Sequence, residues 1–319
     1  MRASSVARYA IPVALGALVG SIAFASPASA ATLPADDEMY SVEYVNNPND
    51  LLMWRVSPGV PTTIAEVAGS PVPGPVEITD SAYDPTTKTA YVIGSGYTTP
   101  CSLWSVTTAP AALTYIADVT VDGTEPVAPT CSAFDILPDG TAYVVVDDSF
   151  LATINLATGI VTTVAELTSE DEPFVDISWI KYDAITDTSF AMDYDGVLFE
   201  LNLTTGVLTF IAEFDLAGAG SYDADIDSAG TLWFQAWNQF VGLWSFDPAN
   251  PAATLTSEGG EVEGWESDSL WIVPAAAVAV EPKPELAATG ASDVAAIAVG
   301  SLTLFALGAL LFLRRRATA

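Results

Sequence analysis

The chain has 319 residues, of which 40 are acidic and nine are basic, and its net charge is −31. A protein this acidic repels phosphate backbones, which argues against nucleic acid as a partner. The sequence contains no histidine, and this excludes serine–histidine and cysteine–histidine catalysis and removes the commonest zinc ligand. The catalytic options that remain centre on carboxylates, tyrosine, serine or a bound hard cation.

Residues 1–30 predict a secretory signal peptide. Arg2 and Arg8 precede an apolar run, residues 11–24, and the small residues Ala28-Ser29-Ala30 follow it as a cleavage site. The apolar run is short for a membrane-spanning helix, which needs about 20 residues. We therefore expect export and cleavage after this triplet in preference to a retained N-terminal membrane anchor.

Residues 31–273 repeat a unit of four short strands, rich in Val, Ile, Thr, Tyr and Trp, with Gly, Pro or Asp at the turns. The equivalent residues Val106, Ile154, Leu201 and Phe246 are 48, 47 and 45 positions apart. This pattern predicts an all-β fold, a β-propeller of about five four-stranded blades, although four or six also fit the spacing. The segment 262–273 is expected to supply the inner strand that the N-terminal blade lacks, so that the two chain ends pair and close the ring.

The segment 199–206, with the sequence FELNLTTG, is similar to repeats of secreted bacterial propellers of the YVTN and NHL kind. The resemblance extends over most of the exported chain. It implies a fold and not an activity, because propellers host both binding proteins and enzymes.

The two cysteines, Cys101 and Cys131, both lie in the exported part of the chain. An even pair in an oxidising compartment predicts a structural disulfide. Closing a loop of this size stabilises a fold by roughly 3–4 kcal/mol in the chain-entropy model.

An aspartate recurs near the end of the predicted innermost strand of four blades, as Asp84, Asp135, Asp183 and Asp227. If these carboxylates meet at one mouth of the central channel, they could bind Ca²⁺, which prefers oxygen ligands. The alternative is that each aspartate begins a turn and bonds its own backbone. Recurrence in every unit favours the turn, because a ligand site needs no such repetition.

Trp237 lies outside the repeated tryptophan positions, in a predicted hairpin turn. An exposed indole at a turn can stack on a sugar or on a partner side chain. We therefore retain Trp237 as a candidate ligand-stacking residue.

The C-terminal region contains four segments in a fixed order. Residues 274–285 form a short Ala- and Pro-rich stalk, and the pentapeptide Leu286-Ala287-Ala288-Thr289-Gly290 follows. Residues 294–313 are almost uncharged and long enough to cross a bilayer as a helix. Residues 314–319 begin with Arg314, Arg315 and Arg316, a basic stop that holds this end in the cytoplasm.

This order resembles the sorting signal of Gram-positive surface proteins, whose pentapeptide reads LPxTG. Ala287 replaces the proline, and the resulting LAxTG form resembles substrates of sortases in high-GC Gram-positive bacteria. The resemblance implies that a sortase cleaves between Thr289 and Gly290 and joins the threonine to peptidoglycan. The membrane helix would then be a temporary tether, whereas an ordinary C-terminal membrane anchor is the alternative. Between residues 31 and 289, 39 acidic residues stand against four basic ones, a net charge of −35.

These features predict a secreted protein anchored in the cell wall, with a binding or adhesion module whose extracellular ligand the sequence does not name. The alternative from another class is a carboxylate- or calcium-dependent propeller enzyme of the glycosidase or lactonase type, for which no catalytic residue can be assigned. A passive acidic coat protein is a third reading.

Overall fold

The computed structural model describes residues 31–44, 51–57, 62–67, 77–96, 99–121, 125–126, 130–169, 176–216, 219–237, 241–257 and 269–274. The predicted signal peptide, most of the stalk, the sorting motif, the apolar C-terminal segment and the arginine tail lie outside these residues. Within the described ranges, no helix is long and apolar enough to span a membrane.

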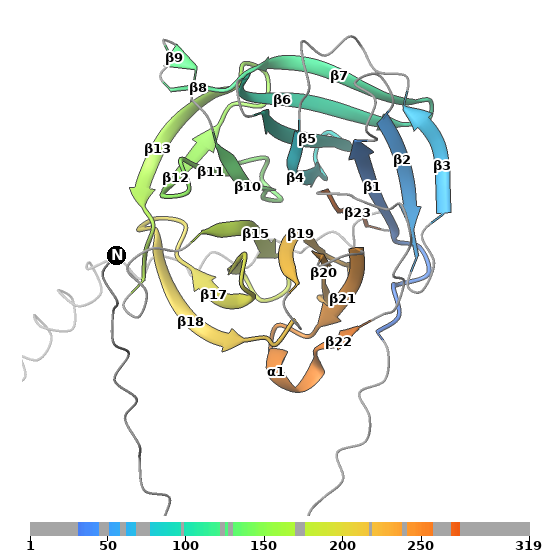
Figure 1. Ribbon diagram of the computed structural model, residues 1–319, viewed down its shortest axis with the longest axis vertical. Coiled ribbons are helices and arrows are strands. Elements are labelled where there is room, and N and C mark those ends of the chain that lie inside the picture. The colour runs from blue at the N-terminus through green and yellow to red at the C-terminus, as the bar shows by residue number, and fades with distance from the viewer. Residues whose placement is uncertain are drawn as a thin grey trace, which may run out of the picture.

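Five antiparallel sheets stand around a central axis as the blades of a β-propeller (Figure 1). From the centre outwards, the strands are β23 (Trp271–Val273), β1 (Glu38–Tyr44), β2 (Leu51–Val56) and β3 (Thr62–Val67) in blade 1; β4 (Glu77–Asp84), β5 (Thr89–Gly96), β6 (Thr99–Thr108) and β7 (Ala111–Asp118) in blade 2; β10 (Cys131–Ile136), β11 (Ala142–Val146), β12 (Phe150–Ile154) and β13 (Ile160–Glu166) in blade 3; β15 (Ile177–Asp183), β16 (Thr188–Asp193), β17 (Val197–Leu201) and β18 (Val207–Glu213) in blade 4; and β19 (Gly220–Ile226), β20 (Leu232–Trp237), β21 (Val241–Phe246) and β22 (Thr256–Ser257) in blade 5. The predicted all-β fold and the count of about five blades are confirmed.

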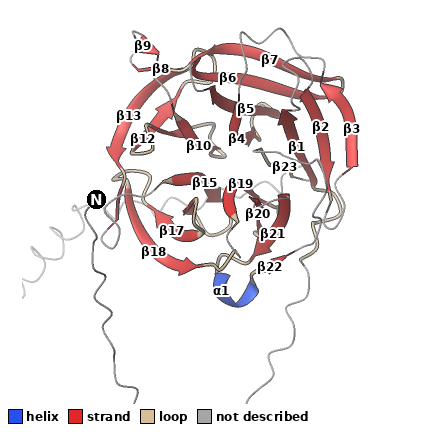
Figure 2. Ribbon diagram, viewed as in Figure 1, coloured by secondary structure: helices blue, strands red, loops and turns tan. Residues whose placement is uncertain are grey.

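Shorter elements complete the chain. They are β8 (Thr120–Val121), β9 (Glu125–Pro126), β14 (Thr168–Ser169) and the single helical turn α1 (Pro251–Thr254). Figure 2 shows strands and connecting loops in the part of the chain that the structure describes, with the helical turn α1 on the outside of blade 5.

The two ends of the propeller pair in blade 1. Strand β23 is the innermost strand of this blade and runs antiparallel to β1, with Met39 opposite Ile272 and Tyr40 opposite Trp271. The predicted closure of the ring is therefore confirmed. It leaves the inner edge of β1 covered, as a closed architecture requires.

Five hydrophobic clusters hold the described ring together, one between each pair of neighbouring blades. Each cluster takes side chains from both facing sheets, because successive residues of a strand point to opposite faces. Four tryptophans from four different blades are among the largest fully buried side chains: Trp104, Trp179, Trp233 and Trp271. Burial on both sheet faces explains why these strands are so apolar.

Glycine is required at two equivalent turns, between the last two strands of blades 3 and 4. Gly159 and Gly206 have positive φ angles of 68° and 70°, a conformation that costs glycine little. A Cβ at Gly159 would lie 2.7 Å from the backbone oxygen of Asp118, the last residue of β7 in the preceding blade. Because the backbones approach closely, the connection after β7 pairs as β8 with β13, the outermost strand of blade 3. The connection after β13 pairs in the same way, as β14, with β18 of blade 4.

The predicted disulfide is confirmed between Cys101 and Cys131, whose Cα atoms are 5.9 Å apart. It joins β6 of blade 2 to the beginning of β10, the inner strand of blade 3. Both cysteines are fully buried. The bridge therefore fixes two neighbouring blades at the end of the channel where β10 begins.

Candidate functional site

Three of the four recurring aspartates are turn residues. The carboxylate of Asp84 accepts hydrogen bonds from the backbone N–H groups of Thr86 and Thr87 and from both threonine hydroxyls. Asp183 makes the same kind of turn in blade 4. Asp227 accepts from two backbone N–H groups of its turn and from the indole of Trp233. Their oxygens are used locally, so the structure supports the turn interpretation for these three.

The alignment of Asp135 with these turn residues is wrong. Strand pairing places Asp135 opposite Tyr143, two positions before the turn, and the position equivalent to Asp84 is occupied by Leu137. Asp139 makes the local turn bond instead, by accepting from the backbone N–H of Thr141. The carboxylate of Asp135 is thereby released from the turn and faces the neighbouring blade.

The centre of the propeller contains a buried charge cluster around Lys181, which is 2% exposed. Its ammonium group donates to Asp80 Oδ1 at 2.9 Å and to the backbone oxygens of Ser81 and Phe134 at 2.7 and 2.9 Å. Asp223 Oδ1 lies 3.2 Å from the same nitrogen. Asp80 and Asp223 are fully buried. The cluster therefore places one ammonium group between two buried carboxylates near the propeller axis.

Four aspartates of the inner strands bind the backbone of the next blade around the ring. Asp80 accepts from the N–H of Phe134, Asp135 from Tyr182, Asp223 from Leu270, and Asp225 from Ile272. Hydrogen bonds from a donor to an ionised acceptor are stronger than neutral ones. Together with Lys181, these contacts join all five blades at the axis.

Burial raises the pKa of Asp135 to about 6 and that of Asp225 to about 7, and the nearby ammonium of Lys181 opposes the increase. Burial also raises the pKa of Asp80, and the proximity of Asp223 raises it further. Although burial opposes the charged form of Lys181, the carboxylates of Asp223 and Asp80 raise its pKa overall. Because the ammonium meets several acceptors, we interpret the cluster as a structural element and not as a proton donor for catalysis.

The described residues contain no group of three or more carboxylates or thiols with metal-binding geometry. The calcium site considered from Asp84, Asp135, Asp183 and Asp227 has no support from their placement, since three of them bond their own turns. Sequence reasoning missed the channel cluster. A signal did exist: the alternating acids Asp223 and Asp225 lie on one inner strand, and Lys181, one of few basic residues, lies on another.

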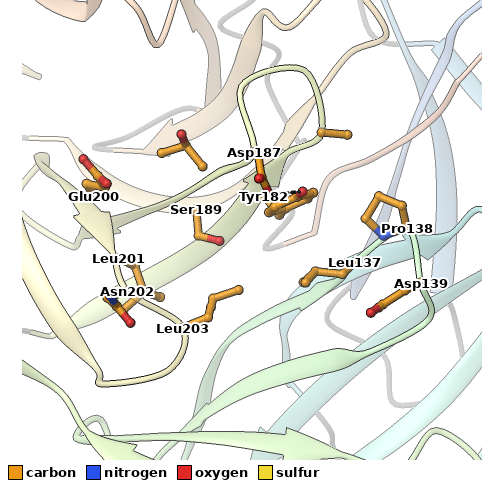
Figure 3. A pocket seen from close by; sticks show the side chains of 12 residues that line it. Leu137, Pro138, Asp139, Tyr182, Asp187, Ser189, Glu200, Leu201, Asn202 and Leu203 are labelled. Carbon is orange, nitrogen blue, oxygen red and sulfur yellow. Dashed lines mark hydrogen bonds between the residues drawn. The ribbon is translucent and has the colours of Figure 1, made fainter. Parts of the chain in front are cut away.

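The larger of two described cavities is a groove of about 560 Å³ between blades 3 and 4, at the end where the inner strands β10 and β15 finish. One wall is the turn after β10, with Leu137, Pro138 and Asp139, and the other is formed by β15, β16 and the end of β17. Figure 3 shows Tyr182 in the middle of this groove, between the Leu137 side and the Leu203 side.

The groove combines apolar and acidic side chains. Its lining includes Leu137, Leu201 and Leu203 together with the carboxylates of Asp139, Asp187 and Glu200, and the described lining residues include no basic side chain. The Tyr182 hydroxyl donates to Asp187 Oδ1 at 2.8 Å. Burial and this hydrogen bond raise the pKa of Tyr182 to about 12, so the ring remains neutral.

A smaller pocket of about 180 Å³ lies at the opposite mouth of the channel. The first residues of the inner strands β4, β10, β15 and β19 line it, whereas the groove lies where such strands finish. Tyr194 and Tyr222 form part of its wall, with ring centroids 5.7 Å apart in an edge-to-face arrangement. Cys131 also lines it, so the disulfide holds this mouth in place.

Trp237 is not in a turn. It is the last residue of β20 and pairs with Val241 on β21, and its side chain lies outside what the structure describes. The stacking role of Trp237 remains a prediction.

No protein-family model matches the sequence, and no curated protein is significantly similar to it. Among solved structures, a protein of unknown function from Bacteroides thetaiotaomicron VPI-5482 is 13% identical with a TM-score of 0.48, over 75% of this chain and 60% of that one. A protein from Bacteroides uniformis ATCC 8492, provisionally named a 6-phosphogluconolactonase, is 13% identical with a TM-score of 0.41, over 70% and 82% of the two chains. A protein of unknown function from Bacteroides caccae is 12% identical with a TM-score of 0.41, over 74% and 98%.

This chain thus spans 60% of the length of the first of these proteins. TM-scores below 0.5 at such identities support no inference about activity or source. The assignment as a five-bladed propeller rests on the strand pairing itself.

Proposed function

We propose that this chain is an exported binding protein anchored in the cell wall, and that the groove between blades 3 and 4 is its recognition site. The groove is the observation that carries the binding role. Its volume of about 560 Å³ lies within the range typical of ligand sites, about 300–1,000 Å³. Its lining combines an apolar surface from Leu137, Leu201 and Leu203 with polar groups that can orient a ligand.

The charge of the groove restricts the ligand. Asp139, Asp187 and Glu200 line the groove, and carboxylates disfavour an anionic molecule at short range. The ring of Tyr182 and the leucine side chains offer a flat apolar surface. A neutral, polyhydroxylated ligand fits this combination, because its hydroxyl groups can bond the carboxylates while its C–H face stacks on the ring.

Measuring the binding of a panel of neutral oligosaccharides tests whether the groove is a sugar site. We expect at least one to bind the wild-type propeller, and we expect Tyr182→Ala to weaken binding tenfold or more because the stacking surface is removed. The matched control is Tyr194→Ala, which removes a tyrosine from the opposite mouth and leaves the groove intact. Absence of binding across the panel, or equal losses in the two variants, would show that the groove is not a sugar site.

The anchoring part of the proposal is supported by the order of the C-terminal segments: Leu286 to Gly290, the apolar residues 294–313 and three arginines. If a sortase joins Thr289 to peptidoglycan, the mature protein loses the apolar segment. The attached product then resists detergent and is released only when the wall is digested.

Replacement of Thr289 tests this step. We expect Thr289→Ala to leave the protein in the detergent-soluble membrane fraction with its arginine tail, whereas Ala287→Pro, which restores the LPxTG form, remains in the wall. Mass spectrometry of wall digests identifies the terminal residue. Recovery of the wild-type protein from detergent with residues 290–319 still attached would indicate an ordinary membrane anchor.

A further inference from the structure

The pocket at the opposite mouth of the channel has a chemistry different from that of the groove. Its volume is about 180 Å³, and a cavity of about 150 Å³ is known to hold a benzene-sized molecule. The pocket therefore suits one side chain or one small head group. It is smaller than the sites that enclose a whole drug-sized ligand.

Two carboxylates line this pocket, and its described lining residues include no basic side chain. Asp148 and Asp176 line it. Burial raises the pKa of Asp176, and the charges of Asp148 and Asp195 raise it further. A positive charge placed among them would relieve this repulsion.

An aromatic pair forms another side of the pocket. Tyr194 is 44% exposed and meets Tyr222 edge to face. The Tyr194 ring packs against Gly220 so closely that a Cβ there would lie 2.3 Å from its Cζ atom. The glycine thus fixes the ring in place and leaves part of the ring open to solvent. Aromatic faces attract cations such as ammonium and guanidinium groups.

We propose that this pocket binds one organic cation, the ammonium or guanidinium group of a lysine or arginine side chain presented by a protein partner. The carboxylates of Asp148 and Asp176 neutralise the charge, and the tyrosines contact the cation or its stem. The net charge of −35 between residues 31 and 289 attracts basic partners from a distance. The site lies at the other mouth from the groove and does not depend on the ligand proposed there.

Calorimetric titration of residues 31–274, which contain the complete closed ring, tests the proposal. The probes are the terminally blocked amides of arginine and lysine, each compared with its uncharged counterpart, citrulline and norleucine. We expect at least one cationic probe to bind tenfold or more tightly than its uncharged counterpart. The probe pair with the larger ratio of charged to uncharged affinity shows whether the pocket prefers a guanidinium or an ammonium group.

The double variant Asp148→Asn/Asp176→Asn is expected to weaken binding tenfold or more. Asparagine tolerates the positive φ of 52° at position 148, so this variant should fold, and its melting curve checks that it does. Asp139→Asn removes a carboxylate from the groove and should leave binding unchanged. Equal binding of charged and uncharged probes, an equal loss in Asp139→Asn, or binding of CaCl₂ without binding of either cationic probe would overturn the proposal.

Discussion

Aspartate serves two different purposes in this propeller, in the turns between inner strands and in the central channel. Asp84 and Asp183 sit at the turns and bond their own backbone. Asp80 and Asp223 are fully buried and bond Lys181 and the backbones of other blades. The turn residues recur from blade to blade because every blade needs that turn. The channel aspartates recur only in some blades. Asp135 and Asp225 occupy the same inner-strand position in blades 3 and 5, whereas blade 4 has Lys181 on its inner strand, where it meets Asp80 and Asp223 near the common axis.

Removal of Lys181 should give the largest effect on stability. Lys181→Met leaves two buried carboxylates without their cation, and breaking such a pair typically costs about 3–5 kcal/mol. The free energy of unfolding in urea measures this loss. Arg55→Met is the matched control, because Arg55 pairs with Glu38 at the surface, where their side chains are 52% and 43% exposed. A surface pair contributes less than about 1 kcal/mol.

A second substitution sharpens this result. Asp223→Asn in the Lys181→Met background removes one of the stranded charges, so the double variant should lose less stability than the sum of the two single losses. Additive losses, or a Lys181→Met variant as stable as wild type, would show that the cluster does not act as a unit.

The two sets of aspartates should respond to pH in opposite directions, with a smaller effect than loss of Lys181. The folded-state pKa values of Asp135 and Asp225, about 6 and about 7, lie above the ordinary value of 3.8. Between about pH 4 and 7 these groups hold protons in the folded state that the unfolded chain releases, so stability falls as pH rises through this window. The turn bonds with Thr86 and Thr87 lower the pKa of Asp84 although burial opposes them. Its contribution is therefore present above its ordinary pKa and is lost as pH falls.

Urea unfolding between pH 3 and 8 measures both responses. Asp225→Asn should reduce the decrease in unfolding free energy between pH 4 and 7 by a few kcal/mol, since one pKa unit corresponds to about 1.4 kcal/mol. Asp84→Asn should cost about 1 kcal/mol at neutral pH and nothing in strong acid. If the two substitutions changed the slope of stability against pH in the same direction, the distinction between channel and turn aspartates would be contradicted.

The sequence was sufficient for features that repeat or that depend on local chemistry. The nearly regular spacing of Val106, Ile154, Leu201 and Phe246 predicted the blades, and the pattern around Trp271 predicted the strand that closes the ring. The disulfide followed from a single pair of cysteines. Each of these features needs only the order of residues along the chain.

The channel and the cavities could not be predicted in the same way. The inner strands β4, β10, β15 and β19 each contain a register shift near their beginning. Such bulges change which side chains point inwards, so alternation along the sequence does not place Asp80 or Asp223 in the channel. The same limit explains the error at Asp135, where Pro138-Asp139-Gly140 moved the turn. The groove and the mouth pocket lie between blades, and their walls come from segments that are distant in the sequence.

The closing strand also determines how the molecule carries tension. A force applied at the C-terminal end enters the propeller through β23, which pairs with β1 over only three residues. Additional bonds resist its removal: Ser269 Oγ bonds both the N–H and the carbonyl oxygen of Val42, and Asp223 and Asp225 hold the N–H groups of Leu270 and Ile272. The hydrogen bonds from Asp223 and Asp225 therefore help to hold β23, the strand nearest the proposed attachment point, in the propeller. Under load, the first event should be the separation of β23 from β1, which opens blade 1.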